Sequence, residues 1–106
     1  MDMRDEWMHG LRAWASANGN VHELWLFGSR ADGSARPESD VDLAIALMPA
    51  VGDENWPLFF YFDLRAKWRQ ELEIIVGRHV SLEAILPDTD GDAYVRRTGV
   101  VLWARD

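Results

Sequence analysis

Apolar residues recur every three or four positions in two parts of the chain, and each part predicts a helix. The first predicted helix covers residues 2–18, where an Asn-Gly-Asn turn ends the pattern. Its apolar face contains Trp7, Leu11 and Trp14. The second predicted helix covers residues 56–76 and is followed by Gly77, a common residue after a helix C-terminus. Its apolar stripe consists of Tyr61, Leu64, Trp68, Leu72 and Ile75.

Four shorter segments have the pattern of β-strands. Residues 22–27 form a nearly continuous apolar run, which is typical of a strand buried on both faces. In residues 40–47, large apolar side chains alternate with aspartate and alanine, which predicts a second strand. Residues 79–86 predict a third strand, and the Val-Val-Leu-Trp-Ala segment after Gly99 predicts a fourth. Between these two, an aspartate-rich turn is expected to cap a short helix over residues 92–98.

The composition is that of an ordinary globular protein. The chain has 106 residues, which favours a single domain over residues 1–106. Its net charge of −7, from 18 acidic and 11 basic residues, argues against direct binding to nucleic acid. The absence of cysteine excludes disulfides, thiolate zinc sites and cysteine nucleophiles. No apolar stretch is long enough to predict a membrane span, and we expect a cytoplasmic protein.

The polar residues with the clearest chemistry flank the second predicted strand. Gly28 and Ser29 follow the first strand, and ten residues separate them from Asp40, with Asp42 two positions later. A glycine lets backbone approach a phosphate closely, and Ser29 opens a helical turn whose N–H groups favour an anion. Asp40 and Asp42 share a strand face, where they repel each other and resist desolvation unless a cation binds. Because Mg²⁺ binds carboxylates together with nucleotide phosphates, the spacing predicts a site for a Mg²⁺-bound nucleotide.

Simpler interpretations of single residues stay open. Asp40 alone could cap a turn, because Ser-Asp pairs are common in turns. Asp42 is harder to explain in this way, since it lies inside an otherwise apolar strand. Arg30 and Arg36 flank the motif, where they either neutralise a triphosphate or form ion pairs with nearby carboxylates.

The motif resembles the signature of the DNA polymerase β-type nucleotidyltransferase superfamily, and more closely that of the small minimal nucleotidyltransferase (MNT) proteins. The family pattern is Gly-Ser, ten residues and Asp-x-Asp, matched here by Gly28, Ser29, Asp40 and Asp42. The segments Leu-Phe-Gly-Ser-Arg-Ala and Ser-Asp-Val-Asp-Leu-Ala-Ile also fit, and the similarity extends over nearly the whole chain. The resemblance implies an α/β (α+β) fold, with a small mixed sheet backed by helices.

The resemblance also implies an activity and roles for the motif residues. Proteins of this family transfer a nucleoside monophosphate from an NTP to a hydroxyl, with Mg²⁺ as cofactor. By this resemblance, Asp40 and Asp42 bind Mg²⁺ and are catalytic, and Gly28, Ser29 and Arg30 bind the nucleotide, which we expect to be ATP.

The sequence departs from the family pattern at its third carboxylate. The family usually has Val-Asp-Leu on the strand after the long helix, and here the segment reads Val-Ser-Leu with Ser81 in the centre. Losing this carboxylate should weaken the site of the metal that activates the attacking hydroxyl more than the site of the triphosphate's metal. Glu83 lies on the same strand face and is kept as a candidate catalytic residue, and His79 shares that face as well. Asp32 is a second departure, because the family often has a basic residue there.

Two functions from different classes follow. The first is an enzyme that moves AMP to a hydroxyl on a partner protein. The resemblance implies that this partner is a HEPN-type RNase toxin and that the chain is its antitoxin, in a hetero-oligomer with it. The second is a catalytically degenerate binding module that neutralises the partner by contact, with Ser81 in place of the third carboxylate. The acidic surface and the surplus among six tryptophans suit docking on a basic RNase. A small-molecule adenylyltransferase is a weaker alternative, since that activity normally needs a longer chain.

Overall fold

The computed structural model describes residues 3–47, 56–86 and 89–105, with residues 56–63 described by their backbone alone. It contains a four-stranded sheet and four helices within these ranges. The elements are α1 (Asp5–Ala17), β1 (Val21–Phe27), α2 (Ser29–Asp32), β2 (Val41–Leu47), α3 (Trp56–Val76), β3 (Val80–Ile85), α4 (Asp90–Thr98) and β4 (Val100–Ala104). The predicted mixed sheet backed by helices is therefore confirmed. In the described ranges, no helix combines the length and the apolar character that crossing a membrane requires.

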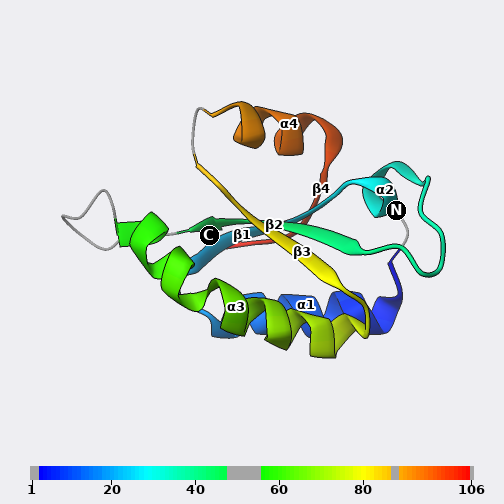
Figure 1. The fold of residues 1–106 in the computed structure, drawn as a ribbon, viewed down its shortest axis with the longest axis horizontal. Coiled ribbons are helices and arrows are strands. Elements are labelled where there is room, and N and C mark those ends of the chain that lie inside the picture. Colours follow the sequence, from blue (N-terminus) through cyan, green and yellow to red (C-terminus); the bar gives the residue numbers. More distant parts are fainter. Residues whose placement is uncertain (1–2, 48–55, 87–88, 106) are drawn as a thin grey trace.

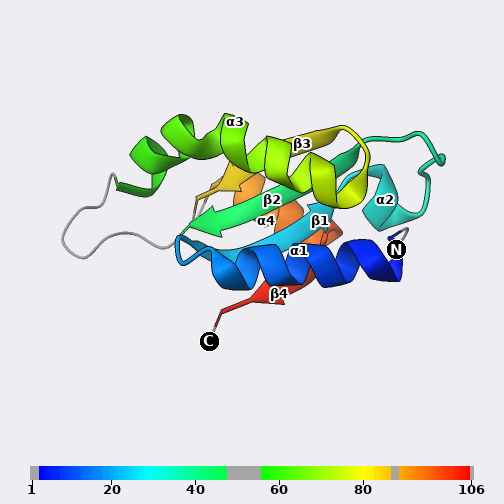
Figure 2. The same cartoon turned by 90° about the horizontal axis from the view of Figure 1, so that it is seen from below.

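The sheet has the strand order β3-β2-β1-β4. β1 pairs antiparallel with both β2 and β4, whereas β2 and β3 are parallel and are connected through α3. α1 and α3 cover one face of the sheet, and α4 lies on the other (Figure 1). Seen from below, α1 and α3 run side by side across the sheet (Figure 2). α4 extends over only part of its face of the sheet, and α2 lies at the right-hand end of the sheet (Figure 1).

The main core lies between the sheet and the pair α1 and α3. From the helices it takes Trp7, Leu11, Ala15, Trp68, Leu72 and Val76. Each of these positions is spaced three or four residues from the next on its helix, as the amphipathic patterns predict. Three other residues of the predicted stripes are only partly buried, namely Trp14, Leu64 and Ile75. The predicted contribution of Tyr61 falls outside the described side chains.

β1 differs from its prediction as a strand buried on both faces. Only Val21, Leu24 and Leu26 are fully buried, and the other residues of the strand are partly exposed. The reason is that only the short α4 packs on the second face, where it partly covers Trp25 and Phe27. The prediction of a strand with two buried faces was therefore wrong, because an apolar run does not show how much of the second face is covered.

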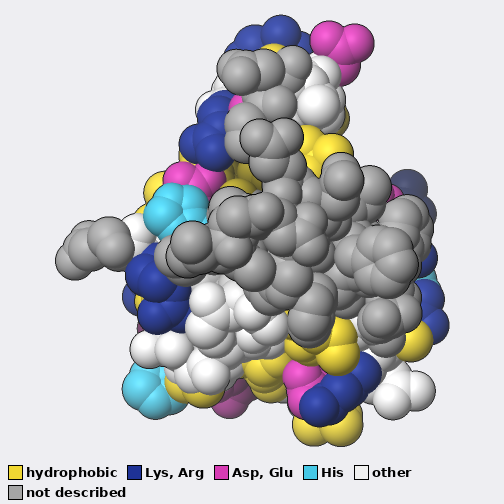
Figure 3. Space-filling view, turned by 90° about the vertical axis from the view of Figure 1, so that its left-hand side faces the viewer, with side chains coloured by type: hydrophobic (Ala, Val, Ile, Leu, Met, Phe, Trp, Pro, Cys, Tyr) yellow, Lys and Arg dark blue, Asp and Glu magenta, His cyan; other side chains and the backbone are white. Residues whose placement is uncertain are grey.

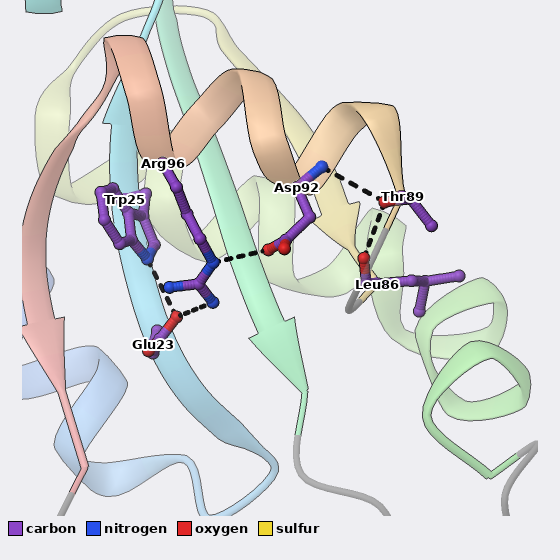
Figure 4. A network of polar contacts seen from close by, with 6 residues as sticks. All are labelled: Glu23, Trp25, Leu86, Thr89, Asp92 and Arg96. Carbon is purple, nitrogen blue, oxygen red and sulfur yellow. Dashed lines mark hydrogen bonds and ion pairs between the residues drawn. The ribbon is translucent and has the colours of Figure 1, made fainter.

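α4 also begins differently from its prediction. It starts at Asp90, not at residue 92, and its N-cap is Thr89 instead of an aspartate. The Thr89 hydroxyl accepts a hydrogen bond from the Asp92 amide at 3.2 Å and donates to the Leu86 carbonyl at 2.7 Å (Figure 4). The rest of the predicted turn, residues 87–88, lies outside the described residues.

A polar network fastens α4 to the sheet (Figure 4). The Arg96 guanidinium donates to Asp92 one turn earlier and to Glu23 on β1, each at 2.8 Å. It also lies over the Trp25 ring, 5.4 Å from the centroid, and the Trp25 indole donates to the same Glu23 carboxylate. These hydrogen bonds raise the pKa of Arg96 above its ordinary value. The network thus adds polar contacts to the apolar packing of Val95 on Ala44 and Ile85.

We expect Arg96→Met to lower the free energy of unfolding by about 1–2 kcal/mol, because two carboxylates lose their charged donor. Arg97→Met is the matched control, since Arg97 is exposed on the same helix, and it should change stability by less than about 0.5 kcal/mol. Urea unfolding followed by tryptophan fluorescence measures both. Equal effects of the two substitutions would show that the network does not hold α4.

Candidate active site

The glycine of the motif lies against the second aspartate. Gly28 ends β1 with φ of 73° and ψ of −155°, a conformation that side chains rarely adopt. Phe27 and Asp42 are register partners in the β1–β2 ladder. A Cβ atom on Gly28 would overlap the Asp42 carboxylate. The sequence motif therefore forms one compact unit, in which backbone and carboxylate are in direct contact.

α2 follows at once and fixes the backbone after the glycine. The Gly28 carbonyl accepts hydrogen bonds from the amides of Ala31 and Asp32, each at 3.1 Å. The Ser29 carbonyl accepts from the next amides, and Gly33 closes the turn in the left-handed region at φ of 86°. Ser29 is therefore the first residue of α2 and directly follows the glycine that lies against Asp42.

The two aspartates form a pair with unequal surroundings. Asp42 is partly buried on β2, and this burial raises the pKa of its carboxyl, as does the negative charge of Asp40, while His79 acts in the opposite direction. Asp40 lies just before β2, and its Oδ2 is 3.2 Å from Nδ1 of His79. The two carboxylates repel each other, and burial adds a desolvation cost for Asp42. A bound divalent cation would offset both effects. In the described part of the chain the two aspartates do not belong to a group of three or more potential metal ligands.

Ser81 occupies the place next to Asp42. The two residues are direct partners in the parallel β2–β3 ladder, so their side chains lie on the same face. Glu83 pairs with Ala44, further along β3, and it is exposed. The register places Ser81 directly beside Asp42, and its interpretation as the position of a lost third carboxylate stays a prediction. The role of Glu83 as a substitute stays a prediction.

Arg30 has a setting that favours support of the loop over contact with phosphate. Its side chain is buried, with 2% of the residue exposed. Its Nη2 donates to the carbonyls of Ser39 and Pro37 at 2.7 and 3.1 Å, and its guanidinium lies 5.2 Å from the centroid of the Trp7 ring. These carbonyls belong to the loop that leads to Asp40. Arg30 therefore supports this loop, and its contact with a nucleotide stays a prediction.

Two further residues contact the loop before β2, and the sequence pattern did not assign them these roles. Arg78 Nε donates to the Pro37 carbonyl at 3.0 Å, and His79 contacts Asp40 as described above. Only the parallel pairing of β2 with β3 brings them next to this loop, from about forty residues away in sequence. Asp32, the other departure from the family, has a local partner instead. Its carboxylate accepts hydrogen bonds from the amide and the hydroxyl of Ser34, and these lower its pKa.

Residues 10–106 match the family model described as polymerase beta, nucleotidyltransferase. The chain belongs to this family. Among curated proteins, no relative matches it. The predicted membership of the polymerase β-type superfamily is thereby confirmed, together with its fold.

Chains in several solved structures share the fold. A chain of a toxin–antitoxin crystal structure with AMP-PNP matches with a TM-score of 0.65 and 20% identity, over 97% of this chain and 76% of that chain. A chain from the complex of the tri-AMPylated Shewanella oneidensis HEPN toxin with MNT antitoxin gives 0.63 and 18%, over 97% and 74%. A Sulfolobus solfataricus protein assigned as a nucleotidyltransferase gives 0.51 and 21%, over 92% and 77%. At these identities the similarity shows the fold alone.

The contact between Gly28 and Asp42 predicts that Gly28→Ala lowers the free energy of unfolding by about 2 kcal/mol or more, because the new Cβ meets the carboxylate and φ is positive. In an Asp42→Ala background the same change should cost less, since the overlapping oxygen is gone. Gly19→Ala is the control: Gly19 has open space around its Cα, and its substitution should change stability by less than about 0.5 kcal/mol. Additive effects of Gly28→Ala and Asp42→Ala in urea unfolding would contradict the contact.

The raised pKa of Asp42 has a definite effect on stability. The folded protein binds this proton more tightly than the unfolded chain does, so the ionised carboxylate lowers stability once pH rises above the ordinary pKa of 3.8. Asp42→Asn should therefore raise the free energy of unfolding at pH 7, or leave it unchanged, and the difference should vanish at about pH 3. Glu38→Gln, which removes an exposed charge nearby, controls for net charge. A loss of more than about 2 kcal/mol in Asp42→Asn would instead make Asp42 a structural residue.

Proposed function

We propose that the chain is a minimal nucleotidyltransferase that moves AMP from ATP to a hydroxyl on a HEPN-type toxin, and that it acts as the antitoxin of that toxin. The observation that carries this proposal is the packed unit of Gly28 and Asp42, with Asp40 at its side. A half-buried carboxylate beside a second one is unfavourable in the isolated domain, whereas nucleotide and cation would satisfy both. The proposal includes a cytoplasmic location, where ATP and Mg²⁺ are available.

Each residue of the unit has a role in the proposed reaction. The Gly28 backbone and the Ser29 hydroxyl bind the β- and γ-phosphates, and the missing Cβ lets the phosphates approach. Asp40 and Asp42 would hold Mg²⁺, which on binding would neutralise the triphosphate oxygens. The toxin hydroxyl attacks the α-phosphorus in line, its proton passes to water, and the bond to the leaving pyrophosphate breaks. Arg30 supports the loop before Asp40 and so helps to fix the carboxylate that follows.

The partner is inferred from the solved structures with the same fold. One of them is a toxin–antitoxin structure with AMP-PNP, and another contains a tri-AMPylated HEPN toxin with its MNT antitoxin. The surface of this chain is compatible with a protein partner. Figure 3 shows the end of the molecule opposite α2, where basic and acidic side chains are mixed over the described part. Direct binding of nucleic acid is not part of the proposal, since the chain carries a net charge of −7.

The second candidate, a binding module without catalysis, is favoured by Ser81. In the ladder it takes the position beside Asp42 from which a third carboxylate would reach a second cation. A serine hydroxyl is a weak ligand for Mg²⁺. In this case the chain would neutralise the toxin by contact alone, and nucleotide binding would be a remnant of the fold's ancestral activity.

A transfer assay separates the two candidates. The chain is purified with its co-expressed HEPN partner and incubated with Mg²⁺ and ATP labelled at the α-phosphate. We expect label on the toxin, loss of label with Asp42→Asn, and a faster transfer with Ser81→Asp, whose new carboxylate adds an oxygen ligand. The affinity for nucleotide should change little in this last variant, because Asp40 and Asp42 are both still present.

Glu83→Gln tests the remaining alternative for the third carboxylate. If Glu83 has replaced it, this variant loses transfer and Ser81→Asp adds little. If neither the natural protein nor any variant labels the toxin, but the natural protein still suppresses the RNase activity of the toxin, the enzyme proposal fails and the binding module stands.

A further inference from the structure

Three contacts from one dipeptide surround Asp40. Arg78 Nε donates to the Pro37 carbonyl at 3.0 Å, three residues before Asp40. His79 Nδ1 is 3.2 Å from the Asp40 carboxylate itself. On the other side, the Val41 amide donates to the His79 carbonyl at 2.9 Å. The backbone before Asp40, its side chain and the backbone after it are therefore each held from the same short segment between α3 and β3.

A second layer supports this arrangement from the core. Arg30 donates to the same Pro37 carbonyl at 3.1 Å, so two guanidinium groups meet at one acceptor. Both guanidinium groups also lie over the ring of Trp7, at 5.2 Å for Arg30 and 6.0 Å for Arg78. Trp7 itself is buried, with 5% exposed. The loop before β2 thus rests on cationic donors whose own positions are fixed by a core side chain.

We propose that Arg78 and His79 are positioning residues that orient the Asp40 carboxylate for the metal-bound nucleotide. This inference rests on the proposed function of the site. Asp40 precedes β2 and so lacks a place in the sheet ladder, and repulsion from Asp42 would turn its carboxylate away. The contact with His79 opposes that rotation. The imidazole can carry a proton on Nδ1 when neutral or charged, so the role needs only a hydrogen-bond donor at that place.

The loss of the third carboxylate makes this orientation more important. With Ser81 beside Asp42, the described site offers two carboxylates to a cation. A site with few protein ligands depends strongly on the placement of each, and residues that orient a ligand commonly change metal affinity by about 10–100-fold. Arg78 should matter less than His79, because Arg30 still donates to Pro37 when Arg78 is removed.

The test measures Mn²⁺ affinity by electron paramagnetic resonance, in the presence of AMP-PNP and without any transfer reaction. His79→Leu should weaken Mn²⁺ binding by about tenfold or more, and Arg78→Met should weaken it by less. His79→Asn should restore most of the affinity, because its side-chain amide can donate from nearly the same place as Nδ1. His9→Leu and Arg97→Met, two exposed residues away from the site, should bind Mn²⁺ like the natural protein.

The outcomes separate this inference from the proposed function. Natural-like Mn²⁺ affinity in His79→Leu would overturn the inference alone. An equal loss in His79→Leu and His79→Asn would overturn it as well, since a donor at that place would then not suffice. Tight binding of Mn²⁺ and AMP-PNP by the natural protein without transfer to a toxin would overturn the enzyme proposal and leave the inference standing. Absence of that binding in the natural protein would overturn both.

Discussion

The backbone of Gly28 and the carboxylate of Asp42 fill adjoining space where β1 ends and β2 begins, and the remaining geometry of the site depends on this contact. Because Phe27 and Asp42 are partners in the ladder, the chain must leave β1 directly beside the carboxylate. Only a residue without Cβ fits there, and its positive φ turns the chain into α2. The position of Ser29 and of the first amides of α2 follows from that turn.

The half-buried state of Asp42 follows from an uneven covering of the sheet. α1 and α3 cover one face, so Val41, Leu43 and Ile45 of β2 belong to the core. On the other face, Val95 of α4 packs on Ala44 and Ile85, and Trp25, Phe27 and Ala46 around this cluster are only partly buried. Asp42 lies on this second face, before the covered part begins. It is desolvated by its neighbours and is still open to a ligand, a combination that neither a closed core nor a free surface would give.

The sequence predicts most of the fold because each element has a local signal. The apolar stripes of α1 and α3 specify one core, and the spacing from Gly28 to Asp42 specifies the site. What the sequence misses depends on contacts between distant segments. The contact of His79 with Asp40 needs the parallel register of β2 and β3, which no local pattern encodes. Likewise, only the folded chain shows that Arg30 is buried and donates to the Ser39 carbonyl in the loop before Asp40.

Ser81 also affects the stability of the isolated domain, apart from any effect on catalysis. A carboxylate at this place would add a third negative charge beside Asp40 and Asp42. The ionised form of Asp42 is already disfavoured by burial and by the charge of Asp40. Serine removes that repulsion and keeps a hydroxyl that hydrogen-bonds to water or phosphate. The domain is then less dependent on a bound cation for stability, while it has one ligand fewer for that cation. The stability of the free domain and its affinity for a cation therefore make opposite demands on the residue beside Asp42.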